Sequence, residues 1–235
     1  MGHSGYKRIG ILGGMSPEST VAYYEYITRS YTERFGDYSY PEILIYSVSF
    51  QPYVDWPNAE RWDLVAQGLS DAAQRLVASG ADLILIATNT MHIVFDQVQA
   101  SVDVPMLSLL EAVASAIQSQ GLSTVGLLGT RFTMEKTFYQ DSLSLRGISV
   151  LVPDARDREF VNQVIYEELV AGQIHDGSRA GYVAVVEKLA ERGAEGIILG
   201  CTEIPLLLRE GDVSLPLLDT TAIHAEAALQ FVLRE

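Results

Sequence analysis

Continuous runs of aliphatic residues alternate along this chain with longer stretches in which apolar residues recur every three or four positions. The short runs do not alternate apolar with polar residues, which is typical of parallel strands covered on both faces. The longer stretches have the spacing of amphipathic helices, and several end at a glycine. Strands are predicted at residues 8–12, 42–48, 82–87, 106–109, 124–128, 149–152, 196–199 and 217–218.

The order of these elements predicts an α/β fold, because strand–helix alternation builds parallel sheets through right-handed crossovers. In such sheets, ligands bind beyond the carboxyl ends of the strands. The segments 38–41 and 50–58 are predicted to be loops. Helices are predicted at residues 19–35, 59–79, 111–120, 159–171, 179–192 and 222–233.

The second half of the chain repeats landmarks of the first half in the same order. An aliphatic run followed by Thr88 matches another followed by Cys201, 113 residues later. Such a period is too long for a solenoid and indicates two similar lobes. Three further pairs are the segments 9–14 and 125–130, 80–82 and 193–195, and 104–107 and 215–218.

Composition excludes several classes of partner. The 30 acidic residues outnumber the 16 basic residues, for a net charge of −14, so neither nucleic acid nor an anionic membrane surface is an expected partner. No apolar run approaches the roughly 20 residues of a membrane span. A single cysteine cannot form an internal disulfide and fits a reducing cytoplasm. One cysteine and four histidines also argue against a structural zinc site.

Cys201 is the most reactive candidate. It follows a predicted strand and precedes a predicted helix start at residues 202–205. Backbone N–H groups at a helix N-terminus stabilise a thiolate, so we expect a lowered thiol pKa, unless Glu203 points at the sulfur. The alternative is that Cys201 is a small buried core residue, the commonest role of a free cysteine.

Other polar residues at predicted strand ends have structural alternatives too. Thr88 could simply cap a helix, and His92 is expected to pack or cap on its own helix. The Ser16-Pro17 pair is typical of a helix start, while the Gly13-Gly14 turn before it could cradle a carboxylate. Dinucleotide, Walker and nucleophile-elbow motifs are absent from the sequence.

With these motifs in place, the chain resembles the cofactor-independent aspartate/glutamate racemases. The resemblance runs in order through Gly-Gly-Met-Ser-Pro-Glu-Ser-Thr at 13–20, Thr-Asn-Thr-Met-His at 88–92, Gly-Thr at 129–130, Gly-Cys-Thr-Glu-Ile at 200–204 and Asp-Thr-Thr-Ala-Ile-His-Ala at 219–225. It implies two pseudo-symmetric α/β lobes with the active site in the cleft between them, often in a homodimer, and no cofactor or metal. In the family the last helix returns to the first lobe, which implies lobes of residues 1–108 plus 220–235 and 109–219.

The resemblance also implies a reaction, the inversion of an amino-acid α-carbon by a base on one face and an acid on the other. Most members use two cysteines, and this chain resembles the subset with a Thr/Cys pair. Cys201 is therefore expected to be the thiolate base and Thr88 the opposing proton donor. The expected substrate is a small amino acid, aspartate or glutamate. Residues expected to bind it are Met15, Ser16, Asn89, Thr90, Thr130 and Thr202, with Gln51 or Arg131 replacing cations that other members carry.

Two other functions remain open from the residues alone. A decarboxylase or isomerase on the same scaffold would use a single cysteine to protonate one face of a carbanion. A two-lobed amino-acid-binding protein would bind without turnover. The segment 88–92 favours the racemase, since it resembles the racemase motif with one substitution.

Overall fold

The computed structural model describes residues 6–234. The chain divides into two compact units, which are described separately here. Unit 1 comprises Met1–Leu109 and Thr221–Glu235, and unit 2 comprises Leu110–Thr220. The chain thus leaves unit 1 once and returns to it with its last helix.

Unit 1 is built on a four-stranded parallel sheet with the order β2-β1-β3-β4. Its register pairs Gly13 of β1 with Ser47 of β2 and Leu12 with Ile86 of β3, so these strands end at one edge of the sheet. The elements of unit 1 are β1 (Ile9–Gly13), α1 (Pro17–Phe35), β2 (Ile43–Ser47), α2 (Phe50–Asn58), α3 (Trp62–Ala78), β3 (Leu83–Ile86), the 3₁₀ helix η1 (Thr90–Val94), α4 (Phe95–Gln99), β4 (Met106–Leu107) and α11 (Thr220–Leu233), which begins at the last residue of unit 2.

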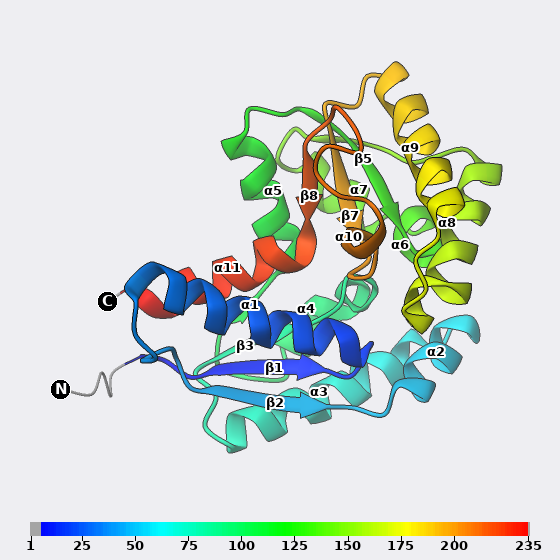
Figure 1. Ribbon diagram of the computed structural model, residues 1–235. Helices are drawn as coiled ribbons and strands as arrows, with labels where there is room; N and C mark the ends of the chain where they lie inside the picture. Colours follow the sequence, from blue (N-terminus) through cyan, green and yellow to red (C-terminus); the bar gives the residue numbers. More distant parts are fainter. Residues whose placement is uncertain (1–5, 235) are drawn as a thin grey trace. The chain divides into compact units, whose positions relative to one another are not determined.

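Helices cover both faces of this sheet because its strands are apolar on both sides (Figure 1). Side chains of β1 and β3 on one face, such as Ile11 and Leu85, pack with α1 and α11. Side chains on the other face, such as Leu12 and Ile86, pack with α2, α3 and α4. The core of unit 1 therefore depends on a helix from the very end of the chain.

Unit 2 repeats this sheet with the parallel order β6-β5-β7-β8, as the internal repeat predicts. Val125–Gly129 of β5 pairs in register with Gly196–Gly200 of β7. Leu128, Ile197 and their neighbours pack with α6, α8, α9 and α10. Its elements are α5 (Leu109–Ser119), whose first residue belongs to unit 1, β5 (Thr124–Gly129), α6 (Arg131–Glu135), α7 (Phe138–Ser144), β6 (Ser149–Leu151), α8 (Ala155–Glu167), η2 (Leu169–Ala171), α9 (Asp176–Glu191), β7 (Gly196–Gly200), α10 (Ile204–Leu207) and β8 (Leu217–Asp219).

All eight predicted strands are present within two residues of their expected ends, but one predicted loop is wrong. Residues 50–58 form α2, with two prolines inside it. Pro52 lies in the first turn, where the missing N–H has no partner in the helix, and Pro57 costs one hydrogen bond near the end. Burial of Tyr53 and Pro57 offsets that cost. As a result, the helix predicted at 59–79 begins only at Trp62.

One smaller difference concerns a helix end. The helix predicted at 159–171 ends at Glu167 and is followed by the separate turn η2. Between residues 6 and 234, no helix is long and apolar enough to cross a membrane.

Candidate functional site

The strand order places most of the predicted site residues at the point in each sheet where the connections reverse direction. In unit 1 this point lies between β1 and β3, and in unit 2 between β5 and β7. Ligands of open parallel sheets bind at such points, outside the carboxyl ends of the strands. The segments leaving these strands carry Met15 and Ser16 after β1, Thr88, Asn89 and Thr90 after β3, Thr130 after β5, and Cys201 and Thr202 after β7.

The turn after β1 is a tightly bonded start to α1. A Cβ atom on Gly13 would lie 2.4 Å from the Thr20 hydroxyl oxygen, so only glycine fits there. That oxygen accepts a hydrogen bond from the Gly14 N–H at 2.8 Å. Ser16 caps α1 by accepting from the Ser19 N–H at 3.3 Å, as its sequence predicts.

The Ser19 hydroxyl ties this turn to the neighbouring one, because it donates to the Ala87 carbonyl at 2.6 Å. Ala87 directly precedes Thr88, and its own N–H donates to the carbonyl of Leu12 at 2.9 Å. The residues after β1 and those after β3 are thus held together in unit 1.

Thr88 itself is half-buried and does not cap a helix. The next residue, Asn89, is the one that precedes η1. The Thr88 N–H donates to the Ile86 carbonyl at 2.9 Å, and the Thr88 carbonyl lies 2.9 Å from Nδ1 of His92. The main chain of Thr88 is therefore bonded on both sides.

Gln51 differs from the other predicted residues. It lies on an exposed part of α2 and donates its side-chain amide to Asp55 at 2.9 Å. Its amide is thus already engaged one helical turn along α2.

In unit 2, a carboxylate lies against the thiol. Cys201 is buried, and its Sγ donates to Oε2 of Glu203 at 2.9 Å. The Thr202 hydroxyl donates to the same oxygen at 2.8 Å. Glu203 is only 5% exposed, so a buried acidic group accepts from both side chains that precede it.

Glu203 points at the sulfur, which is the condition under which the helix start was not expected to lower the thiol pKa. Burial and, after it, the negative charge of Glu203 raise the pKa of Cys201 well above its ordinary value. The backbone N–H groups of residues 202 and 203 lower it, as predicted, but they do not prevail. The helix whose N-terminus was expected to stabilise the thiolate is α10. It begins only at Ile204 and has four residues.

Two tyrosines, Tyr166 and Tyr182, lie within electrostatic range of the thiol, and neither was predicted from the sequence. The pKa of Tyr166 is raised by desolvation and then by the negative charges of Cys201 and Glu203, while Arg131 lowers it. Tyr166 lies near the end of α8 and Tyr182 in α9, so the fold brings both towards the residue that follows β7.

Thr130 has a clear structural role at the start of α6. Its hydroxyl oxygen accepts from the Thr133 N–H at 3.4 Å and lies 3.1 Å from the Thr133 hydroxyl. It is the counterpart of Ser16 in unit 1, since each caps the helix that follows the first strand of its sheet.

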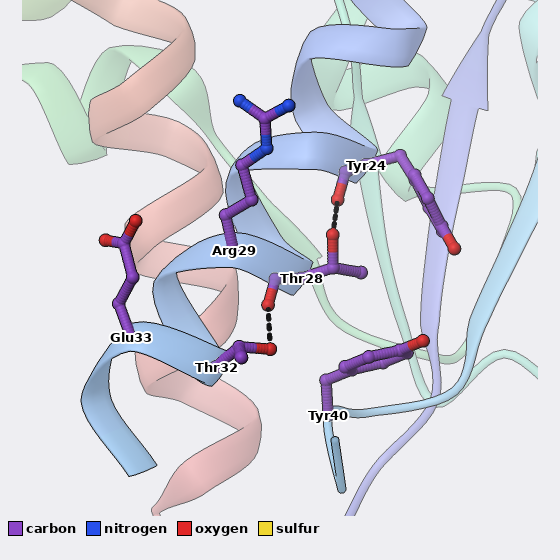
Figure 2. A pocket seen from close by; sticks show the side chains of 6 residues that line it. All are labelled: Tyr24, Thr28, Arg29, Thr32, Glu33 and Tyr40. Carbon is purple, nitrogen blue, oxygen red and sulfur yellow. Dashed lines mark hydrogen bonds between the residues drawn. The ribbon is translucent and has the colours of Figure 1, made fainter. Parts of the chain in front are cut away.

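A surface cavity of about 330 Å³ on α1 has none of the predicted residues (Figure 2). Two of its hydroxyls are already spent inside the helix, because Thr28 donates to the Tyr24 carbonyl and Thr32 to that of Thr28, both at 2.9 Å. The only charged side chains in the described lining are therefore those of Arg29 and Glu33, which have opposite signs. Its lining comprises Tyr24, Thr28, Arg29, Thr32, Glu33 and Tyr40.

Comparison with known proteins shows which family this chain resembles in sequence and in structure. The profile of the Asp/Glu/Hydantoin racemases matches residues 12–228. A solved structure from Yersinia pestis, provisionally described as an Asp/Glu racemase, is 45% identical, with a TM-score of 0.91 over 97% of this chain and 100% of that one. The aspartate racemase of Picrophilus torridus is 25% identical, with a TM-score of 0.80 over 96% and 94%. The broad specificity amino-acid racemase RacX of Bacillus subtilis is 28% identical over 94% of this chain and 96% of its own.

Proposed function

This chain belongs to the Asp/Glu/Hydantoin racemase family, and from that premise we propose that it inverts the α-carbon of an amino acid without a cofactor. The observation that carries the proposal is the buried Cys201 thiol, which meets a carboxylate at the switch point of its sheet. Thr88 occupies the matching position of the other sheet. Each sheet thus contributes one group that can move a proton.

Cys201 is the proposed base, and Glu203 acts through it. A thiol with a raised pKa is a poor base until its proton leaves, and the Glu203 carboxylate, 2.9 Å away, can accept that proton. The thiolate then takes the α-proton of the substrate. Sulfur is then protonated again, as at the start, and the proton that Glu203 accepted returns to solvent, where it balances the proton that Thr88 regains from water.

Thr88 is the proposed donor on the other face of the α-carbon. A hydroxyl is much more acidic than the α-proton of an amino acid, so it can protonate the carbanion, and it regains a proton from water. It is too weakly acidic to rest as an alkoxide, so its role in the reverse direction is to relay a proton. Because the L and D forms are equally stable, kcat/KM must be equal in both directions whatever the pair of residues.

The proposed substrate is aspartate, glutamate or a similarly small amino acid. The turn between Gly14 and the start of α1 is the proposed place for a carboxylate, with Met15, Ser16, Asn89 and Thr90 beside it. In unit 2, Arg131 lowers the pKa of Tyr166, a residue that also feels Cys201 and Glu203, so Arg131 is the better candidate for a side-chain carboxylate than Gln51. The proposed contacts in unit 2 also include Thr130 and Thr202.

We also propose a cytoplasmic homodimer. The lone cysteine fits a reducing compartment. Exposed apolar side chains on and after α1, such as Val21 (56% exposed), Phe35 (49%) and Tyr38 (84%), suit contact with a second copy. Light scattering of the purified protein and fractionation of the cells that make it test the two statements.

Incubation with single amino acids in D₂O tests the proposed function. Inversion accompanied by deuterium at the α-carbon is the expected result. Exchange with retention would leave Thr88 without a role, and release of carbon dioxide from a malonate-type substrate would indicate a decarboxylase. Binding without any exchange would indicate an amino-acid-binding protein.

A further inference from the structure

Two buried histidines of unit 1, His92 and His224, lie next to each other outside the proton-transfer pair. Their ring centroids are 5.8 Å apart and the rings meet edge to face. His92 stacks on Phe95 at 5.4 Å, and His224 meets Tyr23 at 5.6 Å. Neither histidine follows a strand directly, and the reaction proposed above makes no use of either.

The partners of His92 fix where its proton lies. The Leu109 backbone N–H donates to Nε2 at 3.1 Å, so Nε2 carries no proton. Nδ1 must then carry it and donate to the Thr88 carbonyl at 2.9 Å. His92 therefore bridges Thr88 and the first residue of α5.

His224 is held in the opposite tautomer. Its Nε2 lies 3.0 Å from the Leu107 carbonyl, which can only accept, so Nε2 carries the proton. Nδ1 then accepts from the Tyr23 hydroxyl at 2.8 Å. Burial keeps both rings neutral, and it lowers the pKa of His92 to about 4 and that of His224 to about 3.

The main-chain atoms held by this pair have special positions in the chain. Leu107 and Leu109 flank Ser108, directly before the chain passes from unit 1 into unit 2. His224 lies on α11, the helix by which the chain returns. The third atom held is the carbonyl of Thr88, whose side chain is the proposed proton donor.

We propose that His92 is a positioning residue for Thr88, with His224 anchoring the crossover segment on which His92 rests. A peptide carbonyl fixed in direction sets the backbone torsion of its residue, and so the direction in which the Thr88 Cα–Cβ bond points. This inference rests on the proposed racemase function. A merely structural histidine would stabilise the fold without affecting which face of the substrate receives a proton.

Two substitutions separate the two bonds of His92. The amide nitrogen of His92→Asn occupies the place of Nδ1 and can still donate to Thr88. The amide of His92→Gln reaches the place of Nε2, so it retains the Leu109 bond and loses the Thr88 bond. His224→Gln is the matched control, because its amide can still donate to Leu107 from the place of Nε2.

The measurement compares two rates in D₂O, namely inversion and α-proton exchange at the enantiomer whose α-proton faces Cys201. We expect His92→Gln to lower the ratio of inversion to exchange about tenfold, and His92→Asn and His224→Gln to keep it within about twofold of wild type. A parallel loss of both rates in the two His92 variants would overturn the inference but leave the racemase standing. A wild type with neither rate would overturn the proposed function itself.

A measurement on the unaltered protein keeps the inference testable if a variant does not fold. Nitrogen-15 NMR of the imidazole rings should show the Nδ1–H tautomer for His92 and the Nε2–H tautomer for His224. An Nε2–H tautomer at His92 would contradict the bond to Thr88 and overturn the inference.

Discussion

The turn after β3 and the turn after β7 occupy the same place in two sheets of the same strand order, yet they hold their polar residue by different means. Thr88 is held through its main chain, by the ring of His92 and the carbonyl of Ile86. Cys201 is held through its side chain, by the carboxylate of Glu203. A donor needs only a fixed direction, whereas a base must also lose its proton. The comparison suggests that the bonds of the Thr88 turn suit proton donation and that those of the Cys201 turn suit proton abstraction.

The largest expected effect is that of Cys201→Ser. A serine hydroxyl does not become a base beside Glu203, so exchange and inversion should both fall by about 10³-fold or more. Deuterium uptake followed by NMR, together with circular dichroism as a check on folding, provides the measurement. A variant that folds and keeps full activity would remove Cys201 from the mechanism.

Thr88→Ala tests the proposed proton donor in the turn after β3. Without the hydroxyl, inversion should fall by about 10²-fold, while exchange at the face of Cys201 persists. Thr88→Cys restores an acidic group and should match or exceed wild type. The same D₂O assay distinguishes these outcomes, and equal inversion by Thr88→Ala and wild type would show that Thr88 is idle.

Glu203→Gln should separate the pKa of the thiol from its activity. Removing the charge 2.9 Å from Sγ should lower the pKa of Cys201, which is visible in the pH dependence of its ultraviolet thiolate absorbance or of its alkylation. Activity should nevertheless fall by about 10²-fold, because the proton acceptor is gone.

If Glu203 only positioned the thiol, Glu203→Gln would retain activity, since glutamine keeps an acceptor oxygen at the same place. A lower thiol pKa with unchanged kcat would therefore contradict the role given to the carboxylate.

The smallest expected effect concerns the free energy of unfolding and tests the two buried histidines, His92 and His224. Both have a folded-state pKa below the ordinary value of 6.5. As the pH drops below about 6.5, the histidines of the unfolded chain bind protons and those of the folded chain do not. The free energy of unfolding is therefore highest above about pH 6.5 and falls as the pH drops towards about 4.

Between about pH 7.5 and 5.5 the free energy of unfolding should fall by roughly 3 kcal/mol for the two rings together. Urea unfolding at the two pH values measures this, and His224→Gln should show about half the loss. Carboxylates with a lowered pKa, such as Asp82, lose their contribution only at lower pH, so a flat profile in this window would contradict the neutral pair.

Much of the fold follows from the sequence because its signals are local. Continuous aliphatic runs determine the strands, and Ser16-Pro17 gives the start of α1. The helix at 50–58 was missed because its two prolines are compatible with a helix only at the positions they occupy, and because burial of Tyr53 is a tertiary effect.

The candidate site was predictable only where a residue directly follows a strand. Cys201 and Thr88 are found in that way. The approach of Tyr166 and Tyr182 to Cys201 and the tautomers of the histidines depend on contacts between elements distant in the sequence. No period or spacing in the sequence encodes such contacts.

The return of α11 to unit 1 has a consequence for how the molecule is made. Unit 2 is contiguous and has all of its residues once Thr220 has left the ribosome. Unit 1 was synthesised earlier, but its strands Ile9–Gly13 and Leu83–Ile86 still lack Ala225, Ala228 and Leu229 on one face. The first half of the nascent chain thus waits for α11, and a truncation that removes this helix would damage the part of the chain that was translated first.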